Sequence, residues 1–170
     1  RRYSRSENHD TFVQEYEQRA GITISELTVD GLNTAKARMK LNFRKPVDSG
    51  GDFLYICPTI VPFIEKNPFT SQKRQLPVEF SYPYRYRIIV SLMLPEGYTV
   101  EELPKSQRLS ACDESIACTM QLQQQGALMQ CLFEFDLSRI IFPATEYTDL
   151  SAFYGFVMDM CNSRIVLKKS

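Results

Sequence analysis

Two long stretches in which apolar side chains occupy every second position constrain the fold of this chain more than any other feature. Successive side chains of a strand point to opposite faces, so alternation predicts strands with one buried face. The second stretch is interrupted at Gln125-Gly126, where glycine allows a tight turn, and it therefore predicts a hairpin. The apolar positions are Tyr84, Tyr86, Ile88, Val90, Leu92 and Leu94 in the first stretch, and Ile116, Cys118, Met120, Leu122, Met129, Cys131, Phe133 and Phe135 in the second.

Helices are expected near the two ends of the chain. The first ends at Ala20, where Gly21 supplies a left-handed stop. The second has an apolar stripe at the helical period, made of Leu150, Phe153, Tyr154, Val157 and Cys161. Further strands are expected at residues 22–29, 35–43, 53–57, 99–103 and 164–169. The sequence thus predicts a mainly β (α+β) fold, an antiparallel β-sandwich of about eight strands with an N-terminal helix and a C-terminal helix.

The balance of charge limits the partners that the chain can have. Its 170 residues carry 20 basic and 20 acidic side chains, so the formal net charge is zero. Binders of nucleic acid or of anionic membrane surfaces normally carry a basic excess, and the neutral balance argues against both. No stretch approaches the roughly 18 uninterrupted apolar residues that a membrane span needs. We therefore expect no nucleic-acid partner and no membrane span.

Residue types suited to catalysis are scarce. Nucleophilic catalysis of the Cys/His or Ser/His kind needs an imidazole, and the single histidine, His9, lies near the N-terminus, where positioning is poor. Glu134 and Asp136 share a strand face about 7 Å apart by strand rise, a separation that a glycosidase pair can have. A solvated sheet edge explains them without a substrate, since the chain has no tryptophan to form a sugar platform. The sequence predicts a domain that is not an enzyme.

The five cysteines suggest core packing rather than a metal site. They form no Cys-x-x-Cys pair and have no histidine at zinc-ligand spacing, so no metal is expected. The sequence also has no glycine-rich phosphate-binding loop, and no cofactor is expected. Most lie on apolar stripes, where a free thiol behaves as a small hydrophobic residue. A disulfide across the turn between Cys112 and Cys118 is left open, because turn geometry decides it. The cysteines are Cys57, Cys112, Cys118, Cys131 and Cys161.

A tyrosine- and arginine-rich segment is the candidate binding site. Tyr82 and Tyr84 could form a stacking surface for a peptide or a sugar, with Arg85 and Arg87 beside them. In the alternative interpretation, the tyrosines begin the long strand and pack at the edge of the core.

Several motifs at fixed spacing resemble one known family. Over residues 65–169, the chain resembles the C-terminal domain of unknown function that follows the transglutaminase-like core in multidomain bacterial proteins. It departs from the family pattern between Arg108 and Gln125. The matching motifs are Asn67-Pro-Phe, Lys73-Arg74, Pro77-Val-Glu-Phe, Tyr82-Pro-Tyr, Leu94-Pro-Glu-Gly-Tyr-x-Val-Glu-x-Leu-Pro104, Pro143, Glu146-Tyr147, Leu150, Phe153 and Ile165-Val-Leu-Lys-Lys169.

This resemblance implies an accessory role. It implies a β-sandwich accessory domain at residues 65–170, preceded by a helix-and-strand connecting segment at residues 1–64 that packs on it. The expected partner is an upstream transglutaminase-like domain of the same polypeptide, and the expected location is periplasmic or secreted. The domain would contribute to stability, spacing or substrate presentation. The alternative is a module that binds cell-wall peptide, glycan or a partner protein. Because the chain opens with Arg1-Arg2 rather than Met, we expect a piece of a longer product.

Overall fold

The computed structural model describes residues 9–60 and 63–170. The chain divides into two units, Arg1–Asp48 and Ser49–Ser170. The division expected from the sequence lay between residues 64 and 65. Strand β4 (Phe53–Ile56) instead pairs with strand β12 (Ile165–Lys169), so residues 53–56 belong to a sheet of the second unit.

The first unit is one helix followed by one hairpin. Helix α1 (His9–Ala20) precedes strands β1 (Thr23–Asp30) and β2 (Arg38–Arg44), which pair antiparallel. Gly31, at the turn, has a φ of +72°, and a Cβ there would lie 2.2 Å from the carbonyl oxygen of Lys36. The turn therefore requires glycine at this position.

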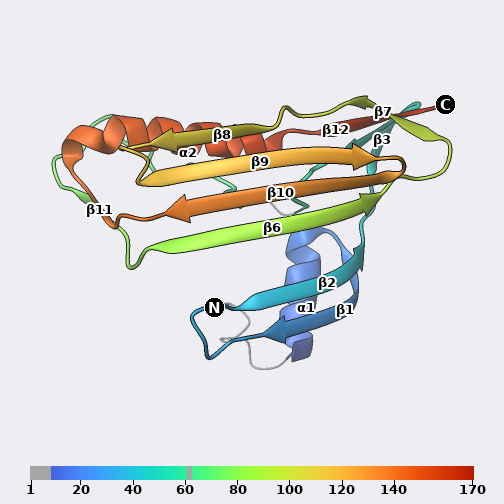
Figure 1. The fold of residues 1–170 in the computed structure, drawn as a ribbon, viewed down its shortest axis with the longest axis horizontal. Coiled ribbons are helices and arrows are strands. Elements are labelled where there is room, and N and C mark those ends of the chain that lie inside the picture. Colours follow the sequence, from blue (N-terminus) through green and yellow to red (C-terminus); the bar gives the residue numbers. More distant parts are fainter. Residues whose placement is uncertain (1–8, 61–62) are drawn as a thin grey trace. The chain divides into compact units, whose positions relative to one another are not determined.

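The second unit is built around a four-stranded antiparallel sheet, which we call the main sheet. Its strand order is β6-β10-β9-β8, so β6 and β8 are its edges (Figure 1). The strands are β6 (Tyr84–Met93), β8 (Gln107–Ala111), β9 (Ile116–Gln125) and β10 (Leu128–Leu137). Strand β10 pairs over its whole length with both neighbours. The predicted hairpin is confirmed, with Gly126 at a φ of +58° as the first residue of a two-residue turn.

One face of the main sheet forms the core. The alternating residues of β9 and β10 are fully or almost fully buried, as the sequence pattern predicted, except for Leu122, which is half-buried near the end of β9. Helix α2 (Tyr147–Asn162) follows a short 3₁₀ helix (Ala144–Glu146) and packs against this face, where Met160 contacts Cys118 and Phe153 contacts Phe135. The buried residues of these strands are Ile116, Cys118, Met120, Met129, Cys131, Phe133, Phe135 and Leu137.

A second four-stranded sheet covers the remainder of the same face. Its strand order is β3-β4-β12-β7, with β3 at Asp48–Gly50 and β7 at Tyr98–Glu102. A cluster of buried residues joins the two sheets, made of Leu94 directly after β6, Met129 of β10, and Ile165 and Leu167 of β12. The fold class is thereby confirmed as a mainly β, sandwich-like α+β fold with an N-terminal and a C-terminal helix.

The described residues contain twelve strands, rather than about eight. The additional strands are β3, β5 (Val78–Glu79), β8 and β11 (Ile141–Phe142), of which β5 and β11 pair only with each other. Three of these are two or three residues long, which is too short for alternation to be visible. In β8 the residues are mostly polar, and the strand pairs on one side only. Among the described residues, neither helix has the length and apolar character to span a membrane.

Asn67 attaches the segment before β5 to helix α2. Its side-chain Nδ2 donates to the Ser151 backbone carbonyl oxygen at 2.9 Å, and its side-chain Oδ1 accepts from the Phe69 backbone amide at 2.9 Å. The Ser151 hydroxyl in turn donates to the Phe69 carbonyl oxygen at 2.9 Å. These bonds hold the Phe69 ring against Tyr154, with the ring centroids 4.9 Å apart.

The variant Asn67→Ala is expected to lower the free energy of unfolding by about 1–2 kcal/mol, because it leaves the Phe69 amide without its acceptor and removes the side-chain donor to the Ser151 carbonyl oxygen. Equilibrium urea unfolding measures this loss. The matched variant Asn67→Asp keeps the acceptor for Phe69 but loses the donor to Ser151, so an intermediate loss is expected. Equal stability of all three proteins would contradict the role assigned to Asn67.

Candidate functional site

The structure places three residues of the predicted binding site on the two faces of β6 and the fourth, Tyr82, before the strand. Tyr84 lies on the inner face, opposite Leu137 of β10, whereas Arg85 and Arg87 lie on the outer face. Tyr82 precedes the strand, and its ring centroid is 6.0 Å from that of Tyr84. The tyrosines are thus brought together, but the arginines do not share a surface with Tyr84. A binding role for this segment stays a prediction.

Tyr84 belongs to a continuous aromatic cluster. Its ring stacks on that of Phe135 at 5.7 Å, and Phe135 also contacts Phe63, Phe153 and Tyr154. Burial raises the pKa of Tyr84, and the neighbouring Tyr82 adds to the increase. Burial also raises the pKa of Tyr154, whose hydroxyl interacts with that of Tyr84. Tyr84 therefore contributes to the core, as the alternative interpretation of the sequence held.

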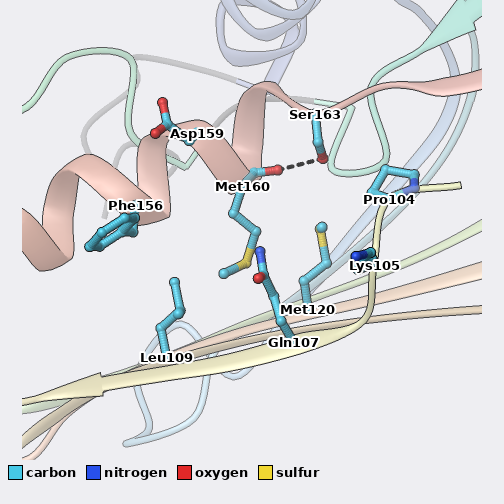
Figure 2. Close-up of a pocket in the computed structure, with 9 residues that line it drawn as sticks. All are labelled: Pro104, Lys105, Gln107, Leu109, Met120, Phe156, Asp159, Met160 and Ser163. Carbon is cyan, nitrogen blue, oxygen red and sulfur yellow. Dashed lines mark hydrogen bonds between the residues drawn. The ribbon is translucent and has the colours of Figure 1, made fainter.

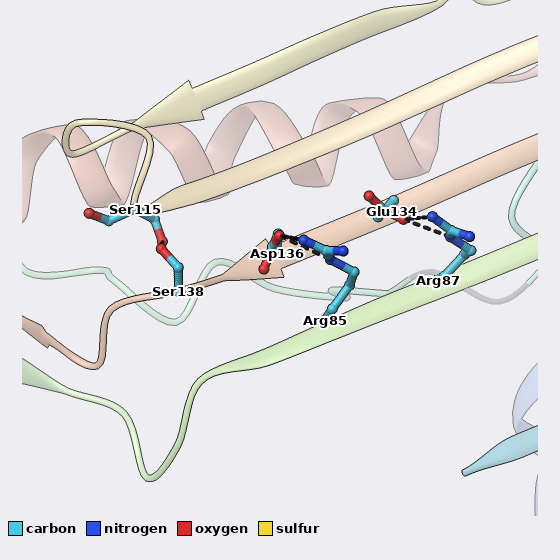
Figure 3. Close-up of polar contacts among 6 residues, drawn as sticks. All are labelled: Arg85, Arg87, Ser115, Glu134, Asp136 and Ser138. Atoms are coloured by element: carbon cyan, nitrogen blue, oxygen red, sulfur yellow. Dashed lines mark hydrogen bonds and ion pairs between the residues drawn. The ribbon is translucent and has the colours of Figure 1, made fainter. Parts of the chain in front are cut away.

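The outer face of the main sheet carries two ion pairs in register. Arg85 lies opposite Asp136 and Arg87 opposite Glu134 (Figure 3). The Arg85 Nε donates to Asp136 at 3.0 Å, and the Arg87 Nε donates to Glu134 at 2.6 Å. Hydrogen bonding to Asp136 raises the pKa of Arg85. Both carboxylates are therefore occupied by a guanidinium group, and they are not placed as an acid and base around a substrate.

The turn between β8 and β9 has an unusual backbone. Three consecutive residues, Cys112, Asp113 and Glu114, have φ values of +53°, +54° and +59°. The left-handed region is unfavourable for residues other than glycine. The turn is anchored where Ser138 donates to the Ser115 carbonyl oxygen through both its amide, at 2.9 Å, and its hydroxyl, at 3.0 Å (Figure 3).

The variant Glu114→Gly is expected to raise the free energy of unfolding by about 0.5–1 kcal/mol, because glycine adopts this φ without the steric cost of a Cβ. The ion pair with Arg108 that is lost is exposed and contributes little. Urea unfolding measures the gain, and Arg108→Ala reports the loss of the ion pair alone. A Glu114→Gly protein less stable than Arg108→Ala would contradict this assignment.

A cluster of charged, aromatic and thiol side chains lies beside the turn. Arg139 forms an ion pair with Glu146, and its guanidinium lies 4.5 Å from the centroid of the Phe142 ring. Cys112 interacts with the Glu146 carboxylate, and burial together with this negative charge raises the pKa of the thiol to about 11. A thiol in this environment stays protonated at neutral pH and is a poor nucleophile.

Three of the remaining thiols, Cys118, Cys131 and Cys161, lie in the core of the second unit, and Cys57 is half-buried. Burial raises the pKa of Cys118 to about 12 and that of Cys131 to about 11, and it also raises the pKa of Cys161. The Cys57 thiol donates to the Cys161 carbonyl oxygen at 3.3 Å. All five thiols are free in the structure, so the Cys112–Cys118 disulfide that was left open is not formed here.

Among the described residues, neither His9 nor the candidate metal ligands form a catalytic or metal site. His9 lies at the start of α1, in the first unit. Within residues 9–60 and 63–170, no three histidine, cysteine or acidic side chains come together in an arrangement that could hold a metal ion.

The second unit contains a cavity of about 260 Å³ between α2 and the edge strand β8 (Figure 2). Leu109, Met120 and Met160 form its apolar wall, and Lys105 and Asp159 lie at its rim (Figure 2). The helix side consists of Phe156, Asp159, Met160 and Ser163, and the strand side of Pro104, Lys105, Gln107, Leu109 and Met120. Sequence reasoning missed this cavity because it did not recognise β8. The one hint in the sequence was that Phe156 is a large apolar residue outside the predicted stripe of the helix, and the structure leaves it 60% exposed.

Comparisons with known proteins bear on the second unit. No curated protein matches the chain. A solved structure of a "putative protease" from Parabacteroides distasonis ATCC 8503 is similar over 68% of this chain, with 15% sequence identity and a TM-score of 0.53. The chain spans 23% of the length of that protein, and the likeness shows the fold alone. Residues 52–167 match a family described as a domain of unknown function with a solved structure, DUF3858, and the chain belongs to this family.

Proposed function

We propose that this chain is a non-catalytic accessory part of a larger protein with a transglutaminase-like or protease-like catalytic domain. In this role it contributes to stability, spacing or substrate presentation. The observation that carries the proposal is the state of the thiols. Cys112, Cys118 and Cys131 all have a pKa raised to about 11 or about 12, whereas a catalytic cysteine needs a lowered pKa.

Two further observations support the proposal. The structurally similar protein from Parabacteroides is much longer than this chain, which leaves room in it for another domain. The carboxylates of Glu134 and Asp136, the other acid–base candidates, are held by arginines. We propose an upstream transglutaminase-like domain of the same polypeptide as the partner, and a periplasmic or secreted location.

Activity assays on the purified chain test the first part of the proposal. We expect no peptidase, amidase or transamidase turnover above that of buffer. Turnover that co-purifies with the chain and disappears in Cys112→Ala or Cys57→Ala would overturn the proposal.

The coding sequence upstream of Arg1 tests the second part. We expect it to encode an export signal and a domain with a Cys, His and Asp catalytic set. An initiator Met directly before Arg1 would overturn the proposed partner. If the domain is present, its activity is compared with and without residues 49–170, and we expect the truncated enzyme to lose stability or turnover of large substrates.

A further inference from the structure

We propose that the cavity between α2 and β8 is a docking site for an extended peptide, which adds as a strand to the open edge of β8. The peptide carries an apolar side chain that enters the cavity and, two residues later, an acidic side chain that lies beside Lys105. This inference concerns a binding site and goes beyond the accessory role proposed above.

The edge of β8 provides the backbone part of the site. Strand β8 pairs with β9 on one side, and among the described residues no strand pairs with its other side. No backbone hydrogen bond outside the β8–β9 ladder is made by Gln107–Ala111 within that part of the chain. An edge strand presents unpaired amide and carbonyl groups, and an extended peptide can satisfy them by adding one more strand.

The register of β8 determines which side chains of a bound peptide would face the cavity. Leu109 lies opposite Cys118, and Gln107 opposite Met120, so both face the core side of the main sheet, where α2 lies. A peptide strand beside β8 would place every second side chain on the same face. Those side chains would point between the strand and the helix, against Leu109 and Met160 (Figure 2).

The exposed Phe156 supplies the outer wall of the site. Its ring is 60% exposed although it lies on a helix whose other large residues are mostly buried. A cavity of about 260 Å³ has room for one large aliphatic side chain. Covering Phe156 and filling the cavity with that side chain would bury apolar surface, which favours binding.

The strand-pairing preference sets the direction of the peptide, and charge at the rim sets its second anchor. Antiparallel pairing is slightly more stable per residue than parallel pairing, and it places the C-terminal part of the peptide beside the start of β8. Lys105 lies there and has no ion pair among the described residues, while Asp159 lies on the helix side. A carboxylate is therefore favoured on the strand side, beside Lys105, which gives the pattern apolar-x-acidic.

Binding of capped synthetic peptides to the whole chain tests the proposal. The probe is acetyl-Thr-Thr-Leu-Thr-Glu-Thr-amide, titrated by NMR while amide shifts of β8 and α2 are followed. We expect saturable binding, and at least about tenfold weaker binding when the leucine is replaced by serine. N-methylation of one alternate set of peptide amides should abolish binding, and N-methylation of the other set should not, because only one edge of the peptide faces β8.

Surface variants assign the binding to this site. Phe156→Ala is expected to weaken binding about fivefold, and Lys105→Glu about tenfold, while neither removes a buried side chain. The Lys105→Glu protein should prefer a peptide in which the glutamate is replaced by lysine. The matched control is Ile89→Ala, which alters a 67% exposed residue on the opposite face of the main sheet and should leave binding unchanged.

Three outcomes would overturn the proposal. The first is no binding of the leucine peptide at millimolar concentration to a folded chain. The second is an equal effect of both sets of N-methyl groups. The third is the same loss of binding in Ile89→Ala as in Phe156→Ala.

Discussion

Replacing Phe135 by alanine is expected to lower the free energy of unfolding of the second unit by about 3–5 kcal/mol. The Phe135 side chain has no exposed surface, and it lies in β10, the strand that pairs with both neighbours over its whole length. Its ring contacts four other rings, with centroid distances from 4.7 Å to Phe63 up to 6.1 Å to Phe153. Removing it leaves a cavity that these neighbours cannot all fill, because they pack on one another.

Urea unfolding, followed by circular dichroism, measures this loss. Phe135→Leu keeps most of the volume and should cost about half as much, since the ring–ring contacts are lost but no large cavity forms. Phe156→Ala is the control for removal of a ring from the surface and should change the free energy of unfolding by less than about 0.5 kcal/mol. A Phe135→Ala protein as stable as Phe156→Ala would contradict the position assigned to the aromatic cluster.

Raising the pH above about 9 is expected to destabilise the folded chain through its buried thiols. Burial raises the pKa of Cys118 from 9.0 to about 12 and that of Cys131 from 9.0 to about 11. In the unfolded chain these thiols lose their protons near pH 9, whereas in the folded chain they keep them. The unfolded state then binds fewer protons, so the free energy of unfolding falls as the pH rises from about 9 to about 12. Below that range the contribution is complete and constant.

The slope of stability against pH identifies the groups responsible. Each shifted thiol contributes at most about 1.4 kcal/mol per pH unit within its range. Urea unfolding in the presence of a reductant, between about pH 7 and about pH 11, measures the slope. Cys118→Ala should be less stable at neutral pH but should show a shallower fall above pH 9. An unchanged slope in both Cys118→Ala and Cys131→Ala would show that other groups cause the alkaline loss.

The parts of the fold that were predictable are those in which one residue pattern repeats several times. The inward residues of β9 and β10 and the apolar stripe of α2 are each set by a local period, and all except the half-buried Leu122 are buried as expected. Strand β8 has only Leu109 and Ala111 as apolar residues, and its position follows from pairing with β9 rather than from its own sequence.

The candidate sites were harder to predict because they depend on pairing across the sequence. Arg85 and Arg87 have the same spacing of two as Glu134 and Asp136, and this complementary pattern could have predicted the pairing of β6 with β10. Considered one segment at a time, the arginines suggested a ligand and the carboxylates suggested catalysis. The cavity beside β8 gave no comparable signal, because a helix and a strand distant in sequence form it.

The position of β12 between β4 and β7 has a consequence for biosynthesis. Ile165 pairs with Ile56, and β12 separates β4 from β7, so these two strands lack their shared partner until residues 165–169 leave the ribosome. The main sheet needs nothing beyond Leu137 and can assemble earlier from its hairpins. During translation, the apolar residues Leu94 and Met129 therefore stay exposed to solvent until Ile165 and Leu167 pack on them. At this stage the nascent chain is most prone to aggregate and most needs a chaperone.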